Sequence, residues 1–225
     1  MTVLLLFTIA VCDLIPLLTV SSLPGVSSSA DGGRMLRRVL CVGALVIIAV
    51  LALLVLPVPW WSGPAAALAG GVWLLLRTRT PAAAVVMVAA VGACALVETG
   101  LGEGIGRGIP VGLTVAAVLL FLTESANCVT RAVLDLTGRG ASADDGLRGG
   151  RVIGPLERIL MAVLALFGAQ AVIAALAAAK GIVRFPAISS DRPGGTRAEE
   201  FLIGSLTSWS LAGGGALLLW AASVL

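Results

Sequence analysis

The chain has 225 residues, of which 59% are hydrophobic and 12% are charged, and its mean hydropathy is +1.08. A soluble domain carries about 25% charged residues, and a fold of this length cannot hide so much apolar surface from water. We therefore expect an integral membrane protein. The absence of histidine excludes histidine-dependent triads and metal sites, and we expect no metal and no other cofactor. The net charge is only +3, and in a membrane protein Lys and Arg residues set the orientation of the helices. These cations therefore do not indicate nucleic-acid binding, and we expect no nucleic-acid partner.

Apolar runs separated by loop-forming residues predict transmembrane helices in chain order. The first, at 3–20, lacks a basic segment before its apolar core, so we expect a retained helix and not a cleaved signal peptide. Further helices are predicted at 38–56, 64–76, 81–97, 109–136 and 198–224. Between the last two, residues 152–184 form either one long helix or a hairpin of two short helices, at 150–168 and 169–184.

The distribution of positive charge favours the hairpin. With a break near Gly168, 14 of the 15 Lys and Arg residues fall in alternate connections, which the positive-inside rule places in the cytoplasm. Without the break, the cations from Lys180 to Arg197 would lie outside. We therefore predict an all-α polytopic transmembrane bundle of eight spans, or seven if 152–184 is one helix. Both termini lie outside in this topology, and residues 1–225 form a single membrane domain.

Two further patterns predict how the helices are placed. Trp60 and Trp61 fall between the second and third spans, where an interfacial aromatic belt is the ordinary explanation. In the last span, small residues recur at every fourth position and predict close helix packing, within the chain or in an oligomer: Gly204, Ser208, Ala212 and Ala216.

A polar stripe interrupts the apolar helix predicted at 109–136. Glu124, Asn127, Arg131 and Asp135 follow one another at intervals of three, four and four residues, so an α-helix would place them on one face. Ionisable groups inside a membrane are functional candidates because they are costly to insert. The alternative is a structural stripe in which Glu124 bonds Asn127 while Arg131 reaches toward the interface.

Charged residues also gather at the cytoplasmic ends of the last three predicted helices: Glu157, Arg158, Lys180, Arg184, Glu199 and Glu200. If the fold brings them together with Arg131, we expect a pocket of four cations and several carboxylates. Such a pocket suits an anionic headgroup, a phosphate or a diphosphate at the inner leaflet. The alternative is ion pairing that only ties short helices together.

A third candidate is Asp13 in the first span. Pro16 follows it by almost one turn and cannot donate a backbone N–H, so the helix is expected to open locally. Asp13 is either a proton donor or carrier, or a paired structural carboxylate.

The C-terminal half also resembles a known family. It is similar, over about residues 120–210, to a family of bacterial, mostly actinobacterial, multi-pass membrane proteins with no assigned activity. The resemblance is carried by these residues: Asn127, Arg131, Gly150, Arg151, Gly154, Glu157, Arg158, Lys180, Arg184, Phe185, Glu199 and Gly204. It implies a membrane fold and, with the Ala-, Gly- and Arg-rich composition, a bacterial cell (inner) membrane.

These observations predict a metal-independent, membrane-embedded enzyme that acts on a lipid-soluble, isoprenoid-type substrate, for example a proton-initiated cyclase. Its catalytic acids and bases would be Glu124, Asp13 and Glu157. Its substrate-binding residues would be Asn127, Arg131, Arg158, Lys180 and Arg184. The expected partners are membrane lipids and a hydrophobic or amphiphilic small molecule. The alternatives are a transporter of small solutes or ions and a structural or accessory membrane subunit.

Overall fold

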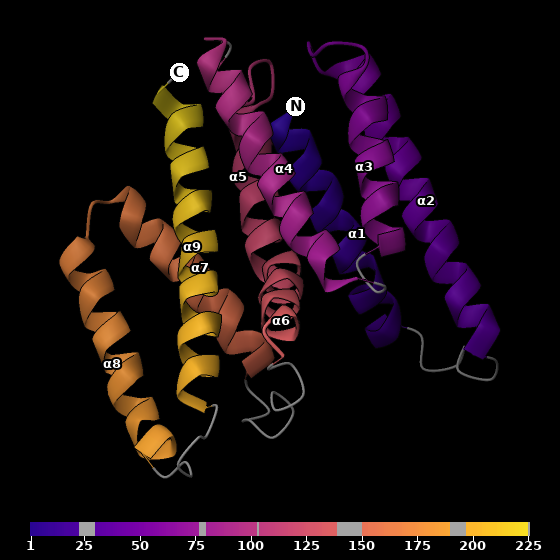
Figure 1. Cartoon of the computed structure of the whole chain (residues 1–225). Helices are drawn as coiled ribbons and strands as arrows, with labels where there is room; N and C mark the ends of the chain where they lie inside the picture. The colour runs from indigo at the N-terminus through magenta and orange to yellow at the C-terminus, as the bar shows by residue number, and fades with distance from the viewer. Residues whose placement is uncertain (23–29, 77–79, 103, 139–149, 190–196, 225) are drawn as a thin grey trace.

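The computed structural model describes residues 1–22, 30–76, 80–102, 104–138, 150–189 and 197–224. Within these ranges the chain is all-helical and has no strand (Figure 1). The helices are α1 (Thr2–Ser22), α2 (Ala30–Val55), α3 (Ser62–Leu76), α4 (Pro81–Gly100), α5 (Val111–Leu120), the π-helical turn η1 (Phe121–Ser125), α6 (Ala126–Leu136), α7 (Gly150–Leu166), α8 (Gln170–Ser189) and α9 (Arg197–Val224). Because α5, η1 and α6 follow one another without interruption, they form one rod, the α5–α6 rod.

Each of the eight predicted segments corresponds to one of these helices or, for 109–136, to the α5–α6 rod. The break near Gly168 is confirmed, since α7 ends at Leu166 and α8 begins at Gln170. Gly168 has a φ of +68°, a left-handed conformation that glycine adopts far more readily than other residues and that commonly ends helices. The alternative of one continuous helix over 152–184 is therefore wrong.

Within the described residues, four helices are long and apolar enough to cross a membrane: Arg38–Val55 within α2, α4, the α5–α6 rod, and Arg197–Ser223 within α9. Their outward faces expose large apolar side chains such as Leu54, Leu96 and Trp220. Soluble proteins rarely expose so many such side chains, whereas lipid tails accommodate them. The chain is thus an all-helical protein with four candidate membrane-spanning helices, and the eight-span topology stays a prediction.

Helix α1 lies in the middle of the bundle and contacts α2, α3, α4 and α5 (Figure 1). Its apolar side chains, including Leu4 and Ile9, are almost completely buried. Helix α3 approaches α1 and α2 closely at Gly70, where an added Cβ would lie 2.5 Å from Thr8 Cγ2 and 2.7 Å from Leu45 Cδ2. Only glycine fits at this crossing without displacing its neighbours.

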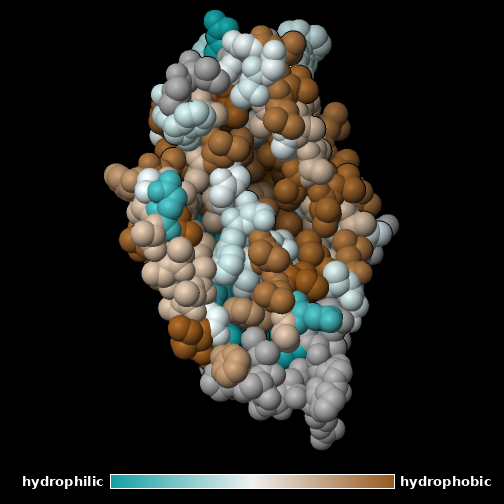
Figure 2. Space-filling view, turned by 60° about the vertical axis from the view of Figure 1, so that its left-hand side comes forward, coloured by the Kyte–Doolittle hydropathy of each residue, from teal (hydrophilic) through white to brown (hydrophobic). Residues whose placement is uncertain are grey.

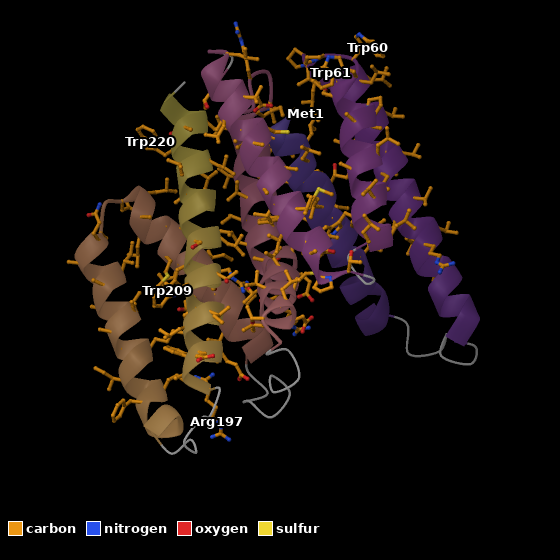
Figure 3. The ribbon with its side chains drawn as sticks, in the orientation of Figure 1. Met1, Trp60, Trp61, Arg197, Trp209 and Trp220 are labelled. Atoms are coloured by element: carbon orange, nitrogen blue, oxygen red, sulfur yellow. The ribbon has the colours of Figure 1, made fainter. Side chains whose placement is uncertain are left out.

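The two ends of the bundle differ. The N-terminus and the end of α9 lie toward one end, here called the upper end, and helices α2, α4, α7 and α9 begin toward the other, the lower end (Figure 1). Trp60 and Trp61 lie at the upper end (Figure 3). The turn between α7 and α8 stands below the upper ends of α4 and α9 (Figure 1).

The small-residue stripe of α9 is buried inside the chain. Ser208, Ala212 and Ala216 are all buried, and α9 packs against α7 and the α5–α6 rod. An added Cβ at Gly215 would lie 3.0 Å from Val118 Cγ1, so the helices approach closely there as well. The stripe therefore brings α9 close to its neighbours, which sets the position of the site described next.

Candidate functional site: a basic cavity at the lower end

The site is organised by Arg158, whose side chain is only 3% exposed. From α7, its Nη1 donates to the backbone carbonyl of Leu122 at 3.1 Å and to Asn127 Oδ1 at 2.9 Å. Its Nε donates to Ser208 Oγ on α9 at 2.9 Å, and longer bonds of 3.4 Å reach the Thr123 carbonyl and Thr130 Oγ1. One guanidinium thus joins α7, α9 and the α5–α6 rod.

The π turn η1 explains why the rod can receive this arginine. In a π turn the backbone N–H bonds the carbonyl five residues earlier, as Ala126 N–H does with Phe121 O. The turn is wider than in an α-helix, and two of its carbonyls, from Leu122 and Thr123, accept hydrogen bonds from Arg158. Such π turns frequently occur at functional sites.

A second polar cluster joins α7, α8 and α9 beside Arg158. Lys180 Nζ donates to Glu157 Oε1 at 2.8 Å and to Oε2 at 2.6 Å, and Trp209 Nε1 donates to Oε1 at 2.9 Å. The ammonium group also lies 5.6 Å from the centroid of the Trp209 ring and 6.0 Å from that of Phe201, which are cation–π distances. Both oxygens of Glu157 are therefore held by donors from neighbouring helices.

These two clusters form walls of a cavity of about 290 Å³ between α6, α7, α8 and α9. All five predicted substrate-binding residues line it, as does Glu157: Asn127, Arg131, Arg158, Lys180 and Arg184. The remaining lining residues are Thr130, Gly154, Glu200, Phe201, Gly204, Ser205 and Ser208. The structure thus brings together charges that lie up to about 70 residues apart in the sequence. Figure 2 shows hydrophilic side chains toward this end of the visible face, below a largely hydrophobic region, and others at its upper tip and at mid-height on its left edge.

The cavity reaches well into the bundle from its lower end. At 1.5 Å per residue, Arg158 lies about 12 Å from the beginning of α7, and Ser208 lies about 16 Å from that of α9. Arg131 and Arg184 lie closer to the ends of α6 and α8 and are exposed. The cavity therefore has an accessible basic entrance and a buried polar floor.

Two of the three predicted catalytic carboxylates do not line this cavity. Glu124, in η1, is half-buried, and its negative charge acts on Arg158 together with that of Glu157. Asp135 is exposed, so the expected stripe from Glu124 to Asp135 does not face one site. The physical reason is the π turn, which shifts Glu124 out of the α-helical register of α6.

Asp13 lies elsewhere in the bundle. Its carboxylate is buried in α1 and accepts a hydrogen bond of 3.0 Å from Trp73 Nε1 on α3. This bond joins the central helix to its neighbour. The bond fits the structural alternative expected from the sequence, and the role of Asp13 as a proton donor or carrier stays a prediction.

A larger cavity of about 550 Å³ lies between α4, α5 and α9, next to α1. It is lined by apolar residues such as Val91, Phe121 and Leu218, and the described lining includes no charged residue. An enzyme that protonates an apolar substrate would need an acid at such a wall. Neither Glu124 nor Asp13 is there.

Sequence reasoning missed three contributors to the site. Phe201 and Trp209 had no predicted role, and Ser208 was expected only to pack. The sequence contains a pattern that could have identified them. Residues at helical spacing on the segment after Glu200 would share one helix face: Phe201, Ser205, Ser208 and Trp209. An aromatic residue at such spacing indicates a buried helix face but not the cation it contacts.

The comparisons with known proteins return no match. No protein-family model matches the chain, and neither a curated protein nor a solved structure is significantly similar to it. The family resemblance over about residues 120–210 thus stays a prediction, and the function is argued from the geometry of the cavity.

Proposed function

We propose that this protein is a multi-pass membrane protein that binds the anionic headgroup of a membrane amphiphile in its basic cavity. The observation that supports this most directly is the charge of the cavity wall. The described residues that line it include four cations and two carboxylates, within a bundle whose outward faces are apolar. Cations in such surroundings favour an anionic ligand, and Arg in particular matches the geometry of carboxylate and phosphate groups.

The same proposal assigns the lower end of the bundle to the cytoplasmic side of a bacterial cell membrane. Arg38 at α2, Arg131 at α6 and Arg184 at α8 lie near helix ends on that side, as the positive-inside rule requires. Trp60 and Trp61 lie at the upper end, where an aromatic belt would meet the outer interface (Figure 3). In this topology the chain crosses eight times and both termini are outside.

The geometry favours binding over the acid–base enzyme expected from the sequence. Glu157 alone among the predicted catalytic carboxylates lines the cavity, and its oxygens are already held by Lys180 and Trp209. That engagement suits a positioning role for Glu157. The proposal is therefore headgroup binding, without the proton-initiated cyclisation that Glu124 and Asp13 suggested.

Native mass spectrometry of the full chain in detergent tests this proposal. The protein is offered phosphatidic acid, phosphatidylglycerol or phosphatidylcholine. We expect tighter binding of at least one anionic lipid than of phosphatidylcholine, and loss of that preference in Arg131→Gln/Arg184→Gln.

The matched control is Arg38→Gln/Arg107→Gln, which also removes two exposed cations but none from the cavity. The control should bind as the unmodified chain does. Equal binding of all three lipids, or an equal loss in both double variants, would show that the cavity does not bind anionic headgroups.

A further inference from the structure

The floor of the basic cavity holds a hydrogen-bond donor that has no acceptor. Asn127 is only 9% exposed, and its Oδ1 accepts a hydrogen bond from Arg158 Nη1. A guanidinium only donates, so the amide cannot be turned around without opposing two donors. Its Nδ2 group therefore faces away from Arg158, and it has no hydrogen-bond partner among the described residues. A buried amide N–H without an acceptor is unfavourable, so this position favours a ligand that supplies one.

Gly154 keeps the space beside Asn127 Oδ1 and the guanidinium of Arg158 open. It lies one turn before Arg158 on α7 and lines the cavity. An added Cβ would stand 3.3 Å from Asn127 Oδ1 and 3.5 Å from Arg158 Nη2. Glycine is a poor helix former, so its presence inside α7 is better explained by this space than by local propensity.

The charge of the cavity wall indicates how much negative charge the ligand carries. Lys180 and Glu157 neutralise each other in an ion pair. Among the described lining residues, the remaining charged groups are Arg131, Arg158 and Arg184 against Glu200, an excess of two positive charges. Arg131 and Arg184 form no ion pair with a carboxylate in the part of the chain that the structure describes. Because uncompensated charge is costly beside a low-dielectric interior, a ligand with two negative charges complements this wall best.

We infer that the ligand group is a phosphate dianion, either a phosphomonoester at the end of an amphiphile or free inorganic phosphate. This inference rests on the headgroup binding proposed above. A phosphomonoester carries about two negative charges at neutral pH and three strong acceptor oxygens. These oxygens match donors from three helices: Asn127 Nδ2 on α6, Arg158 Nη2 on α7 and Arg184 on α8. A carboxylate or a phosphodiester carries a single charge and offers only two such oxygens, so either leaves part of the wall uncompensated.

The volume of the cavity agrees with a headgroup. At about 290 Å³ it lies at the lower end of the roughly 300–1,000 Å³ that ligand pockets occupy. It therefore takes the phosphate and the first atoms of an amphiphile, while the rest of the molecule stays outside it.

A competition experiment on the full chain in detergent tests this inference. Native mass spectrometry compares short-chain phosphatidic acid, a phosphomonoester, with phosphatidylglycerol, a phosphodiester, and with a fatty acid of equal chain length. We expect phosphatidic acid to bind about tenfold more tightly than either, the ratio that one additional charge-assisted hydrogen bond supplies. Inorganic phosphate is added in a separate arm.

The inorganic phosphate arm identifies the source of the dianion. Phosphate that binds as tightly as phosphatidic acid supports the free ion as ligand, whereas phosphatidic acid that binds much more tightly supports the lipid. Both outcomes support a phosphate dianion. Failure of both to bind more tightly than phosphatidylglycerol would overturn the inference.

Two variants locate the binding at the floor of the cavity. Asn127→Asp keeps the shape of the side chain and the acceptor for Arg158 but replaces the free donor by a negative oxygen. It should abolish the preference for phosphatidic acid, and Gly154→Ala should weaken it, while Arg38→Gln leaves it unchanged. An Asn127→Asp protein that keeps the preference would also overturn the inference.

The outcomes separate this inference from the function on which it rests. If phosphatidic acid and phosphatidylglycerol bind equally, and both more tightly than phosphatidylcholine, headgroup binding stands and the choice of a dianion is wrong. If neither exceeds phosphatidylcholine, both are wrong.

Discussion

The guanidinium of Arg158 donates a hydrogen bond to the backbone carbonyl of Leu122, inside the π turn of the α5–α6 rod. The π turn and Arg158 complement each other, because the wide turn presents carbonyls to a neighbouring helix and the buried cation needs acceptors. The contact also holds Asn127 in the orientation that leaves its Nδ2 facing away from Arg158. The floor of the basic cavity is therefore built from main-chain geometry as much as from side chains.

Replacing Arg158 by Gln should destabilise the fold strongly. The change removes a buried group that donates to two backbone carbonyls, Asn127 and Ser208, and it leaves these acceptors without their donor. We expect a loss of about 3 kcal/mol or more in the free energy of unfolding, measured by denaturant titration in detergent.

The control for this substitution is Arg131→Gln, which removes an exposed arginine from the same cavity. It should change the free energy of unfolding by only about 0.5 kcal/mol. Equal effects of the two substitutions would contradict a structural role for the buried arginine.

The ion pair between Glu157 and Lys180 should show measurable coupling. The two side chains are 18% and 30% exposed, so solvent weakens the pair, while Trp209 adds a hydrogen bond to the same carboxylate. A double-mutant cycle with Glu157→Gln and Lys180→Met should give a coupling energy of about 1 kcal/mol. Additivity of the two single changes would mean that the pair contributes nothing to holding α8 against α7.

The close approach of α3 to the central helix predicts opposite behaviour of two adjacent glycines. Gly70→Ala places a Cβ within 2.7 Å of side chains on both α1 and α2, so we expect a loss of about 1–3 kcal/mol in the free energy of unfolding. At Gly71 an added Cβ meets nothing within 4 Å, and Gly71→Ala should be neutral or stabilising by up to about 1 kcal/mol. Thermal unfolding of the two variants in detergent checks the difference, and a destabilised Gly71→Ala protein would show that the α3 packing is described wrongly.

The proposed topology predicts which positions can be labelled from outside the cell. In a background without the four native cysteines, Trp60→Cys and Phe167→Cys should react with a membrane-impermeant maleimide added to intact cells. Arg38→Cys should react only after the membrane is opened. Phe167 is the most informative position because it is 83% exposed beside the α7–α8 turn. Labelling of Phe167→Cys only after opening would show that this hairpin does not cross the membrane.

Much of the fold could be predicted because its signals are local. Apolar runs of defined length and the residues between them are enough to locate helices, since each helix satisfies its own backbone hydrogen bonds. Gly168 is an example, because a glycine between two apolar segments, together with the charge distribution, predicted a break that the structure shows.

The π turn could not be predicted in this way. Residues 121–125 continue an apolar run, and nothing in FLTES distinguishes a π turn from an α-helix. The expected alignment of Glu124 with Asn127 and Arg131 assumed a regular helix, whereas Glu124 lies in the π turn and does not line the cavity. The donor that its carbonyls accept arrives from α7, more than 30 residues later in the chain.

Composition and the spacing of apolar runs alone determined that this chain is strongly apolar and helical, with segments long enough to cross a membrane. They also identified the charges that meet in one cavity, because orientation rules place those charges at the same ends of successive helices. Only the tertiary structure decided which of them are buried, which are paired and which remain open to a ligand. Those properties depend on distances between helices, which are set by close contacts at glycines and by shared hydrogen bonds, and no local pattern encodes them.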